Sequence, residues 1–439
     1  MSKFKQYAGY KESGIEWTVK IPSSWNTVKA GFVYDITLGK MIQTEKKKST
    51  DKLVPYLKAN NVQDNFINYK TVDYMYASEA EVEKYRLKES DLLVCEGGEV
   101  ARSAFMDKSL NDCIFQNALH RVRSTKQGNL GYLHYILNVI RHSEFINILV
   151  NRATIAHFTR DKFSSLRIPL PSSHEQKNIS DILDRKTSEI NSLISDKERL
   201  IELLEEKRQA VITETVTKGL DPNVKMKDSG IEWIGEIPEH WESIKLNYLT
   251  SLRSRKASVD SKLPYLGLEN VSSMTGQIIK FNTTADIDGG ALLFFKSDIL
   301  FGKLRPYLMK CVVAPEDGRC TTEFLVIKTK KQVLNNKYLK YMMLSTDFIE
   351  KVNSSTYGAK MPRANWDFIR NLFIPLPSYQ DQVYIVESIE GKLQDISIAS
   401  KKIREQISKL KEYRESLIYE AVTGKIDVRE YVSEIEEVH

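Results

Sequence analysis

Short clusters that combine basic, amide and aromatic side chains are the residues in this chain best suited to chemistry. Gln116, Asn117, His120, Arg121 and Arg123 stand within one short stretch, next to a predicted strand. Asn and Gln can each form two hydrogen bonds to adenine, and Arg can do the same to guanine, through the DNA major groove. These side chains therefore predict contacts to DNA bases, with a solvated or capped strand end as the alternative.

Further basic clusters suit the same chemistry, because cationic side chains neutralise backbone phosphates. Lys303, Arg305 and Tyr307 lie between two predicted buried strands, where a loop could present them to a groove. An ordinary charged turn is the alternative there, and a solvated surface is the alternative elsewhere. The remaining candidates are Arg253 and Arg255, followed by two groups that predict a basic loop late in each half: Thr154, His157 and Arg160, then Lys360 and Arg363.

Catalytic motifs are missing from the sequence. It contains no G-x-G-x-x-G, no Walker A pattern, no Asn-Pro-Pro-aromatic tetrapeptide and no His or Cys spacing typical of metal ligands. Asp91 and Asp298 precede predicted strands and could serve a nuclease, but no acidic and lysine partners follow them, so turn capping is favoured. We therefore predict no catalytic residue, no metal site and no bound cofactor.

Length and composition set broad limits. The chain has 439 residues, enough for about three domains or for two domains with connecting elements, and 41% of them are hydrophobic, so wholesale disorder is excluded. No stretch approaches the ~20 apolar residues of a membrane span, and the polar N-terminus does not resemble a secretory signal. Four scattered cysteines form no C-x-x-C pair. We therefore expect a protein of the reducing cytoplasm.

The sequence contains an internal repeat with a period near 210 residues. Residues 11–25 (KESGIEWTVKIPSSW) match residues 227–241 (KDSGIEWIGEIPEHW) at nine of fifteen positions. A period this long is typical of two whole domains rather than of stacked short repeats. Further pairs follow in the same order: PYL-x3-NV at 55–62 and 264–271, SDLLV at 90–94 against SDILF at 297–301, IPLPS at 168–172 and 374–378, and TETVTKGLD at 213–221 against YEAVTGKID at 419–427.

Each half ends in a long predicted helix, over residues 174–218 and 379–424. Ser172 and Ser378 of the two IPLPS motifs can cap these helices. Apolar residues recur in alternating steps of four and three, which is typical of a coiled-coil seam, so we expect the helices to pair antiparallel. Domain-capping helices are the alternative. The predicted seam residues are Ile179, Leu183, Ile190, Leu193, Leu200 and Leu204 in the first helix, and Ile385, Ile389, Ile396, Ile403, Leu410 and Leu417 in the second.

The blocks before these helices mix short apolar runs with turn residues. Three runs predict buried strands, at 92–94, 311–313 and 324–327, and two segments predict amphipathic helices, at 131–150 and 337–352. The predicted fold class is therefore α+β, with two globular blocks joined by two long antiparallel helices in a pseudo-two-fold arrangement. Globular and helical regions alternate in the predicted divisions, which are 1–171, 172–225, 226–377 and 378–439.

The net charge of +6 is unevenly distributed. Residues 174–218 carry eight Lys or Arg and ten Asp or Glu, and residues 379–424 carry seven and eight. The two helices are thus net negative, by −2 and −1, and the rest of the chain carries the balance of +9. Because phosphate neutralisation needs cationic side chains, we expect DNA to bind to the globular blocks.

The doubled motif pattern resembles the specificity (S) subunit of type I restriction–modification enzymes. The resemblance covers essentially the whole chain. The motifs that carry it are SGIEW-x3-IP-x2-W (13–25 and 229–241), PYL-x3-NV, SDILFGKLRPYL (297–308), CIFQNALHRVR (113–123) and IPLPS-x3-Q (168–176 and 374–382).

The resemblance implies a division of labour. Two target recognition domains, 1–171 and 226–377, would each read one half of a split site in double-stranded DNA. The helical regions would fix the spacing and dock two methyltransferase (M) subunits, which use S-adenosylmethionine to methylate adenine, and two restriction (R) subunits would use ATP and Mg. The chain itself would catalyse nothing. Because recognition blocks vary with the target, our candidate contacts rest on chemistry and position alone.

Two other functions stay open on the sequence. An autonomous nuclease or methyltransferase would turn over substrate by itself with magnesium or S-adenosylmethionine. A coiled-coil scaffold would bridge two proteins without DNA, and its binding would not respond to salt as phosphate contacts do.

Overall fold

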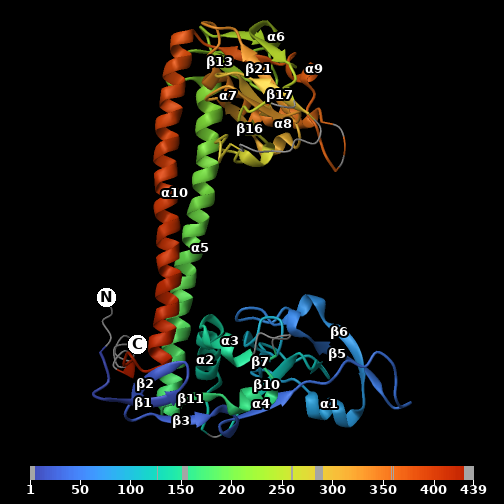
Figure 1. Ribbon diagram of the computed structural model, residues 1–439, viewed down its shortest axis with the longest axis vertical. Coiled ribbons are helices and arrows are strands. Elements are labelled where there is room, and N and C mark those ends of the chain that lie inside the picture. The colour runs from blue at the N-terminus through green and yellow to red at the C-terminus, as the bar shows by residue number, and fades with distance from the viewer. Residues whose placement is uncertain are drawn as a thin grey trace. The chain divides into compact units, whose positions relative to one another are not determined.

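The computed structural model describes residues 5–125, 127–150, 157–258, 261–281, 290–356, 358 and 360–429. The chain forms two compact units: unit 1 is Met1–Asp196 with Gln406–His439, and unit 2 is Lys197–Glu405. Each unit holds a globular block of helices and strands together with parts of both long helices, α5 (Ser173–Lys218) and α10 (Tyr379–Val422), as Figure 1 shows. The predicted α+β class and both long helices are confirmed. The predicted division into four segments stays a prediction.

The block of unit 1 is built on an antiparallel four-stranded sheet of order β4-β10-β7-β8, with a three-stranded sheet β6-β5-β9 and the pairs β1-β2 and β11-β3. Its strands are β1 (Tyr10–Ile15), β2 (Thr18–Pro22), β3 (Asn26–Lys29), β4 (Tyr34–Leu38), β5 (Lys52–Leu57), β6 (Asp73–Ala77), β7 (Leu92–Cys95), β8 (Ser103–Phe105), β9 (Ile114–Phe115), β10 (Leu119–Ser124) and β11 (Arg167–Leu170). Its helices are α1 (Glu79–Tyr85), α2 (Leu130–His142), α3 (Phe145–Val150) and α4 (Arg160–Ser165), with 3-10 turns at Ala30–Phe32, Ala59–Asn61 and Tyr69–Thr71.

The block of unit 2 repeats this plan with the sheet β15-β21-β18-β19, the sheet β16-β20-β17 and the pairs β14-β22 and β12-β13. Its strands are β12 (Met226–Asp228), β13 (Glu236–Pro238), β14 (Glu242–Lys245), β15 (Thr250–Arg253), β16 (Tyr265–Leu266), β17 (Ala291–Phe294), β18 (Ile299–Gly302), β19 (Cys311–Val313), β20 (Gly318–Thr321), β21 (Phe324–Thr329) and β22 (Phe373–Leu376). Its helices are α6 (Leu246–Leu249), α7 (Asn336–Met343), α8 (Thr346–Ser354) and α9 (Trp366–Ile369), with 3-10 turns at Leu268–Asn270 and Pro306–Leu308.

The two blocks differ at one sheet edge. β5 and β9 pair in parallel, as do their counterparts β16 and β20. The third strand of that sheet joins β5 in unit 1, where it is β6, but joins β20 in unit 2, where it is β17. The shared scaffold therefore accepts an added strand on either side of its second sheet.

The predicted strands at 92–94, 311–313 and 324–327 are confirmed as β7, β19 and β21. The predicted single helices at 131–150 and 337–352 are wrong, because each is two helices: α2 with α3, and α7 with α8. At the first break Ser143 Oγ donates to the Ile140 carbonyl (2.8 Å), and at the second Ser345 Oγ donates to the Met342 carbonyl (2.7 Å). A serine hydroxyl that satisfies a terminal carbonyl ends a helix without disturbing its amphipathic pattern.

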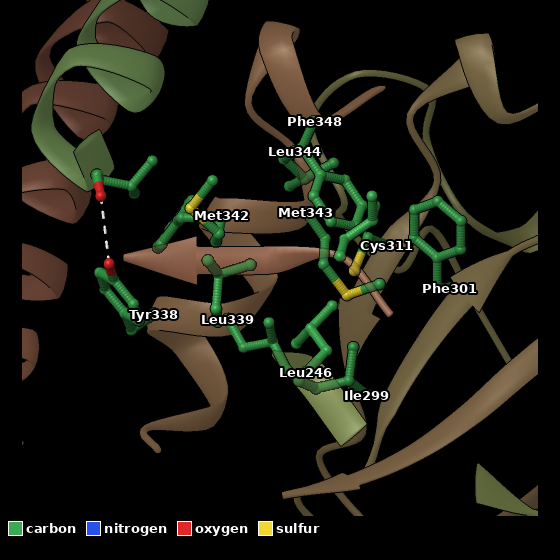
Figure 2. Packing of buried hydrophobic residues seen from close by; sticks show 14 of the residues in the cluster. Leu246, Ile299, Phe301, Cys311, Tyr338, Leu339, Met342, Met343, Leu344 and Phe348 are labelled. Atoms are coloured by element: carbon green, nitrogen blue, oxygen red, sulfur yellow. Dashed lines mark hydrogen bonds between the residues drawn. The ribbon is translucent and has the colours of Figure 1, made fainter. Parts of the chain in front are cut away.

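Each block is held to both long helices by the same polar contacts. The Tyr132 hydroxyl donates to the Val422 carbonyl near the end of α10 (3.1 Å), and the Tyr338 hydroxyl donates to the Val216 carbonyl near the end of α5 (3.1 Å). Each hydroxyl also lies 3.0–3.2 Å from a carbonyl of the IPLPS segment, so its one hydrogen is shared between two carbonyls. Figure 2 shows Tyr338 directed from the hydrophobic cluster of unit 2 toward the helix. Buried hydroxyls with such partners fix where the block meets the helix.

A buried glutamine makes a second repeated contact at the start of each long helix. Gln176 and Gln382 are both 0% exposed. Their amide oxygens accept from the backbone N–H of Asn129 (2.9 Å) and Asn335 (2.8 Å), and each amide nitrogen donates to two further carbonyls at 3.0–3.1 Å. The glutamine of IPLPS-x3-Q is therefore a structural residue that ties the helix to the loop before α2 or α7.

The long helices pair antiparallel within each unit. In unit 1 the first half of α5 lies beside the last half of α10, and Arg414 Nη1 donates to Asn191 Oδ1 (2.5 Å). In unit 2 Arg208 and Ser397 face a common pocket between the other two halves. Among the predicted seam residues Leu204 and Leu410 are half-buried, and these are buried: Ile179, Leu183, Ile190, Ile385, Ile389, Ile396, Ile403 and Leu417.

The prediction places two leucines of α5 in the seam that do not lie there. Leu193 and Leu200 are 50% and 44% exposed, whereas their neighbours Ile194 and Ile201 are buried and half-buried. The buried face is therefore displaced by one residue after Ile190. A helix of 3.6 residues per turn drifts against a strict seven-residue repeat, so adjacent apolar positions compete for the seam, and spacing alone does not separate them.

Candidate nucleic-acid interface

Three segments distant in sequence meet beyond the end of β7 in unit 1. The backbone N–H of Glu96 donates to the Ala118 carbonyl (2.9 Å), and the backbone N–H of Phe158 donates to the Glu96 carbonyl (2.7 Å). Asn117 N–H donates to the Lys40 carbonyl (3.0 Å), which adds the segment after β4. We name residues 40–42, 96, 116–117 and 157–160 the loop surface of unit 1. It contains four of the candidate side chains.

These four candidates differ in how far they reach solvent. Gln116 and Asn117 are half-buried, whereas His157 is 49% exposed and its Nδ1 lies 3.8 Å from the Glu96 carboxylate. Arg160 is exposed, although its Nε donates to the Ile36 carbonyl (2.8 Å), which fixes the base of the side chain. The surface thus offers amide, imidazole and guanidinium groups together, a set able to contact both base edges and phosphates.

Sequence reasoning missed two apolar members of this surface. Met41 is 74% exposed and Ile42 is 48% exposed, directly after Lys40. They sit beside Gln116 because Gly39 lets the two backbones approach closely: a Cβ on Gly39 would lie 2.2 Å from the Gln116 carbonyl oxygen. Exposed apolar side chains in such a place can contact a thymine methyl group or wedge between bases. Their only signal in the sequence is an apolar pair between Lys40 and the basic run at 46–48.

His120 and Arg121 are buried, which removes them from the candidate interface. His120 is 0% exposed, and its Nε2 lies 2.7 Å from the Phe158 carbonyl. Burial lowers the pKa of His120 to about 4, so the ring is neutral near pH 7. Arg121 is 5% exposed and donates to the carbonyls that end α1 and the following turn (3.1 and 2.9 Å). The prediction of base contacts from these two residues is wrong because both faces of β10 are covered. His120 packs against Phe158 and Phe163 on one face, and Arg121 lies over Phe115 on the other.

Arg123 and Arg253 are engaged by the two repeat-equivalent aspartates. Arg123 reaches Asp91 with Nε and Nη2 (2.5 and 2.8 Å), and Arg253 Nε lies 2.8 Å from Asp298. Each aspartate also accepts from a backbone N–H of the turn before its strand (2.7 and 2.9 Å), so the favoured turn-capping role is present. Both arginine side chains are about 30% exposed, which leaves room for at most a shared contact with DNA.

The same arrangement recurs beyond the end of β18 in unit 2. Lys303 N–H donates to the Glu323 carbonyl (2.9 Å), and Ala364 N–H donates to the Lys303 carbonyl (2.8 Å). Arg305 N–H donates to the Pro362 carbonyl (2.8 Å), so the loop after β18 lies against the segment before α9. We name residues 303–307, 321–323 and 360–363 the loop surface of unit 2. It unites two candidate groups that the sequence separates by more than fifty residues.

Its side chains form a basic and aromatic surface. Arg305 and Lys360 are exposed, Tyr307 is 50% exposed and Lys303 is half-buried. Arg363 holds Glu323 with two contacts of 3.2 Å. Arg305 has a φ of +51°, in the left-handed region that non-glycine residues seldom adopt. Such strain is commonest at functional sites, which supports a role for this loop.

The other candidates are placed as follows. Arg255 is exposed at the end of the four-stranded sheet of unit 2. Thr154 lies outside the described residues. Within the described part of the chain, no three His, Cys, Asp or Glu side chains gather as a metal site. No helix there is both long and apolar enough to span a membrane.

The chain matches one family twice. Residues 22–203 and 238–409 match the type I restriction modification DNA specificity domain. The chain belongs to this family. The two matched stretches coincide with the two halves of the internal repeat, and the role of the family is DNA sequence specificity, as the resemblance predicted.

Related specificity subunits align with nearly the whole length of this chain. The type I restriction enzyme MjaVIII specificity subunit of Methanocaldococcus jannaschii is 24% identical over 438 residues, which cover 96% of this chain and 97% of that protein. The StySPI specificity subunit of Salmonella potsdam is 22% identical, with 93% and 90% covered.

Solved structures show the same fold. A chain from a study of complex assembly and conformational transition of a type I R-M system has a TM-score of 0.68 at 14% identity, over 93% of this chain and all of that one. The HsdS subunit of Thermoanaerobacter tengcongensis has a TM-score of 0.55 at 14% identity, with 92% and 98% covered.

Proposed function

We propose that this chain is the non-catalytic DNA-reading subunit of a cytoplasmic restriction–modification assembly. Each loop surface reads one half of a split site in double-stranded DNA, and the long helices set the separation of the two halves. Two methyltransferase subunits, which bind S-adenosylmethionine, methylate adenine at the site. Two restriction subunits, which use ATP and Mg, cut DNA that lacks the mark.

One observation carries the proposal: the two loop surfaces share a backbone but differ in chemistry. Glu96 and Lys303 occupy the same position, since each makes the same two backbone bonds to its neighbouring segments. The position of His157 in unit 1 holds Arg363 in unit 2. A rigid frame with interchangeable side chains is what two readers of different half-sites need, because base contacts carry sequence specificity and the frame only positions them.

Point variants in the loop surface of unit 2 test this role. The chain is prepared with its methyltransferase partner, and affinity for the target is measured against salt concentration. Arg305→Ala should weaken binding by roughly 1–3 kcal/mol and relax base preference in one half-site, as for a base-contacting arginine. Lys360→Ala should reduce the salt slope by about 1 without changing preference.

The matched control is Lys401→Ala, an exposed lysine of α10 outside the block. It should leave both affinity and salt slope unchanged. If Arg305→Ala and Lys401→Ala behave alike, the loop surface of unit 2 does not read DNA.

The alternatives have their own signatures. A protein scaffold would bind its partners without a steep fall in affinity as salt rises, and an autonomous enzyme would turn over substrate without other subunits. The host methylome separates them most directly. Deletion of this chain should abolish methylation at one split adenine motif, and an unchanged methylome would exclude the proposed role.

A further inference from the structure

In unit 1 the chain's own N-terminal segment fills a site beside the long helices. Tyr7 is 7% exposed, and its ring meets Trp25 edge to face with 5.6 Å between centroids. Its hydroxyl donates to Glu175 Oε1 (2.7 Å), in the first turn of α5. The Lys5 carbonyl accepts from the backbone N–H of Asp427 (2.7 Å), so the segment runs antiparallel to the chain that follows α10.

Unit 2 has a cavity at the equivalent place. It has a volume of about 160 Å³ and is lined by Trp241, Asp381, Pro238 and Gly219, among others. Trp241 corresponds to Trp25 by the IP-x2-W motif, and Asp381 corresponds to Glu175 by its place directly before the glutamine of IPLPS-x3-Q. The two partners of Tyr7, an indole and a carboxylate, therefore both line the unit 2 cavity. We name this cavity the aromatic pocket.

An apolar residue beside the filled site of unit 1 is buried, whereas its counterpart beside the aromatic pocket of unit 2 is exposed. Ile426, which follows the end of α10 in unit 1, is 5% exposed. Leu220, its counterpart after α5, is 46% exposed, and Tyr384 at the rim of the pocket is 52% exposed. Large exposed apolar side chains around an aromatic cavity mark a surface suited to a partner.

We propose that the aromatic pocket is a docking site for an extended, basic segment of a partner polypeptide that inserts one tyrosine side chain. The ring packs against Trp241 and its hydroxyl donates to Asp381. The chemistry of the occupant is taken from unit 1, where the same pair of groups holds the tyrosine of a Lys-Gln-Tyr sequence. The lining carries two carboxylates, Asp221 and Asp381, against the single ammonium group of Lys218, and this balance favours a basic flank.

The size of the pocket supports a side chain over a free small molecule. Small-molecule sites usually enclose ≈ 300–1,000 Å³, well above this cavity. A single aromatic anchor in a desolvated pocket is, by contrast, a common source of binding energy between proteins. The hydroxyl gives selectivity, because a hydrogen bond to a carboxylate is stronger than one between neutral groups.

The test uses the full-length chain and a fluorescein-labelled peptide of its own first ten residues, MSKFKQYAGY. Fluorescence anisotropy should report saturable binding. Loss of the anchor in a peptide with Tyr7→Ala should weaken binding about thirtyfold or more. A peptide with Tyr7→Phe keeps the ring but loses the hydroxyl, and should bind about tenfold more weakly.

Two variants of the protein locate the contact. Asp381→Asn should narrow the preference for the tyrosine peptide over the phenylalanine peptide, because the amide oxygen accepts a weaker hydrogen bond than the carboxylate does. Asp395→Asn, an exposed aspartate of the same helix away from the pocket, should keep the preference for tyrosine. Circular dichroism should show the same helix content in both.

A photoreactive benzophenone at the Tyr7 position of the peptide gives an independent readout. Cross-links should fall within residues 218–241 or 379–385. Cross-links to residues 20–25 or 173–178 would show that the peptide displaces the chain's own N-terminal segment in unit 1, and would overturn the proposal. Absence of binding at millimolar peptide would also overturn it, as would self-association of the chain that Asp381→Asn abolishes.

Discussion

The two globular blocks agree where they meet the long helices and differ where they face solvent. Tyr132 and Tyr338 bind helix carbonyls at the same distance, and Gln176 and Gln382 make the same three hydrogen bonds. The two loop surfaces make the same backbone hydrogen bonds, but the position of Glu96 in unit 1 is occupied by Lys303 in unit 2. Attachment to the helices and the proposed DNA contacts therefore use separate residues, so one set can change without the other.

This separation has a physical basis. Attachment uses buried groups, whose hydrogen bonds are costly to lose because no water replaces the missing partner. The proposed recognition surfaces consist of exposed or half-buried side chains on loops, where most substitutions change stability by less than about 0.5 kcal/mol. Substitutions that alter specificity are therefore tolerated on the loop surfaces, and substitutions at the attachment sites are not.

The largest expected effect concerns the helix seam, which both units share. Ile194→Asp buries a charge that has no partner and should destabilise the chain by roughly 3–5 kcal/mol. Leu193→Asp changes the adjacent, exposed residue and should alter stability by less than about 0.5 kcal/mol. Urea unfolding monitored by circular dichroism measures both. Equal effects would show that the seam does not follow the buried face described above.

This pair also shows what the sequence predicts and what it leaves open. The repeat, the strands and the long helices follow from motif order and periodicity, because burial of a whole face leaves a regular pattern. The choice between Ile194 and Leu193 does not, because both are apolar and the partner helix decides. Burial of His120 and Arg121 was unpredictable for a similar reason: the elements that cover the two faces of β10 decide which of its polar side chains are buried. The meeting of Arg305 with Pro362 depends on tertiary contacts that no local pattern encodes.

A second test concerns acid, to which the two blocks should respond differently. His120 and His134 are buried in unit 1, and burial lowers the pKa of each to about 4. Strand register places Leu325 of unit 2 at the position of His120. Unfolded histidine has its ordinary pKa near 6.5, so the unfolded chain takes up protons first as the pH falls. The contribution of each neutral, buried histidine to the free energy of unfolding is therefore complete above pH 6.5. It falls by roughly 3 kcal/mol between pH 6.5 and pH 4.

His120→Leu introduces the residue found at this position in unit 2 and should remove about half of this pH dependence, because His134 remains. At pH 7 the variant should lose about 1 kcal/mol with the hydrogen bond to Phe158. At pH 4.5 it should be more stable than the parent. Urea midpoints across this pH range give the comparison, with exposed His157→Leu as the control. A parallel loss of stability in parent and variant would contradict the assignment.

A third test asks whether the two attachment sites are equivalent in energy as well as in geometry. Gln176→Ala and Gln382→Ala each remove the hydrogen bonds of the amide to one backbone N–H and two carbonyls, although in unit 1 the Gln127 carbonyl keeps a contact with Ser173 Oγ. Each should cost about 2–3 kcal/mol, since an unsatisfied buried group costs ≈ 1–3 kcal/mol. Hydrogen exchange read by mass spectrometry should show lost protection near residues 127–133 in the first variant and 333–339 in the second. A clear loss of stability in only one variant would show that the two attachment sites differ in energy.

The smallest effect concerns one place where the helix seams differ. Ile194 of α5 is a buried apolar residue, whereas its counterpart on α10, Ser400, is 3% exposed and its Oγ has no hydrogen-bond partner within the described residues. Ser400→Ala removes a buried hydroxyl that loses its water on folding, and should stabilise unit 2 by about 1 kcal/mol. Part of the gain is the better helix propensity of alanine, which is at most ~0.5 kcal/mol. Ser397→Ala, at an exposed position one turn earlier, measures that part alone. If both variants gain equally, Ser400 is satisfied in solution, and the seam of unit 2 carries a polar contact that unit 1 lacks.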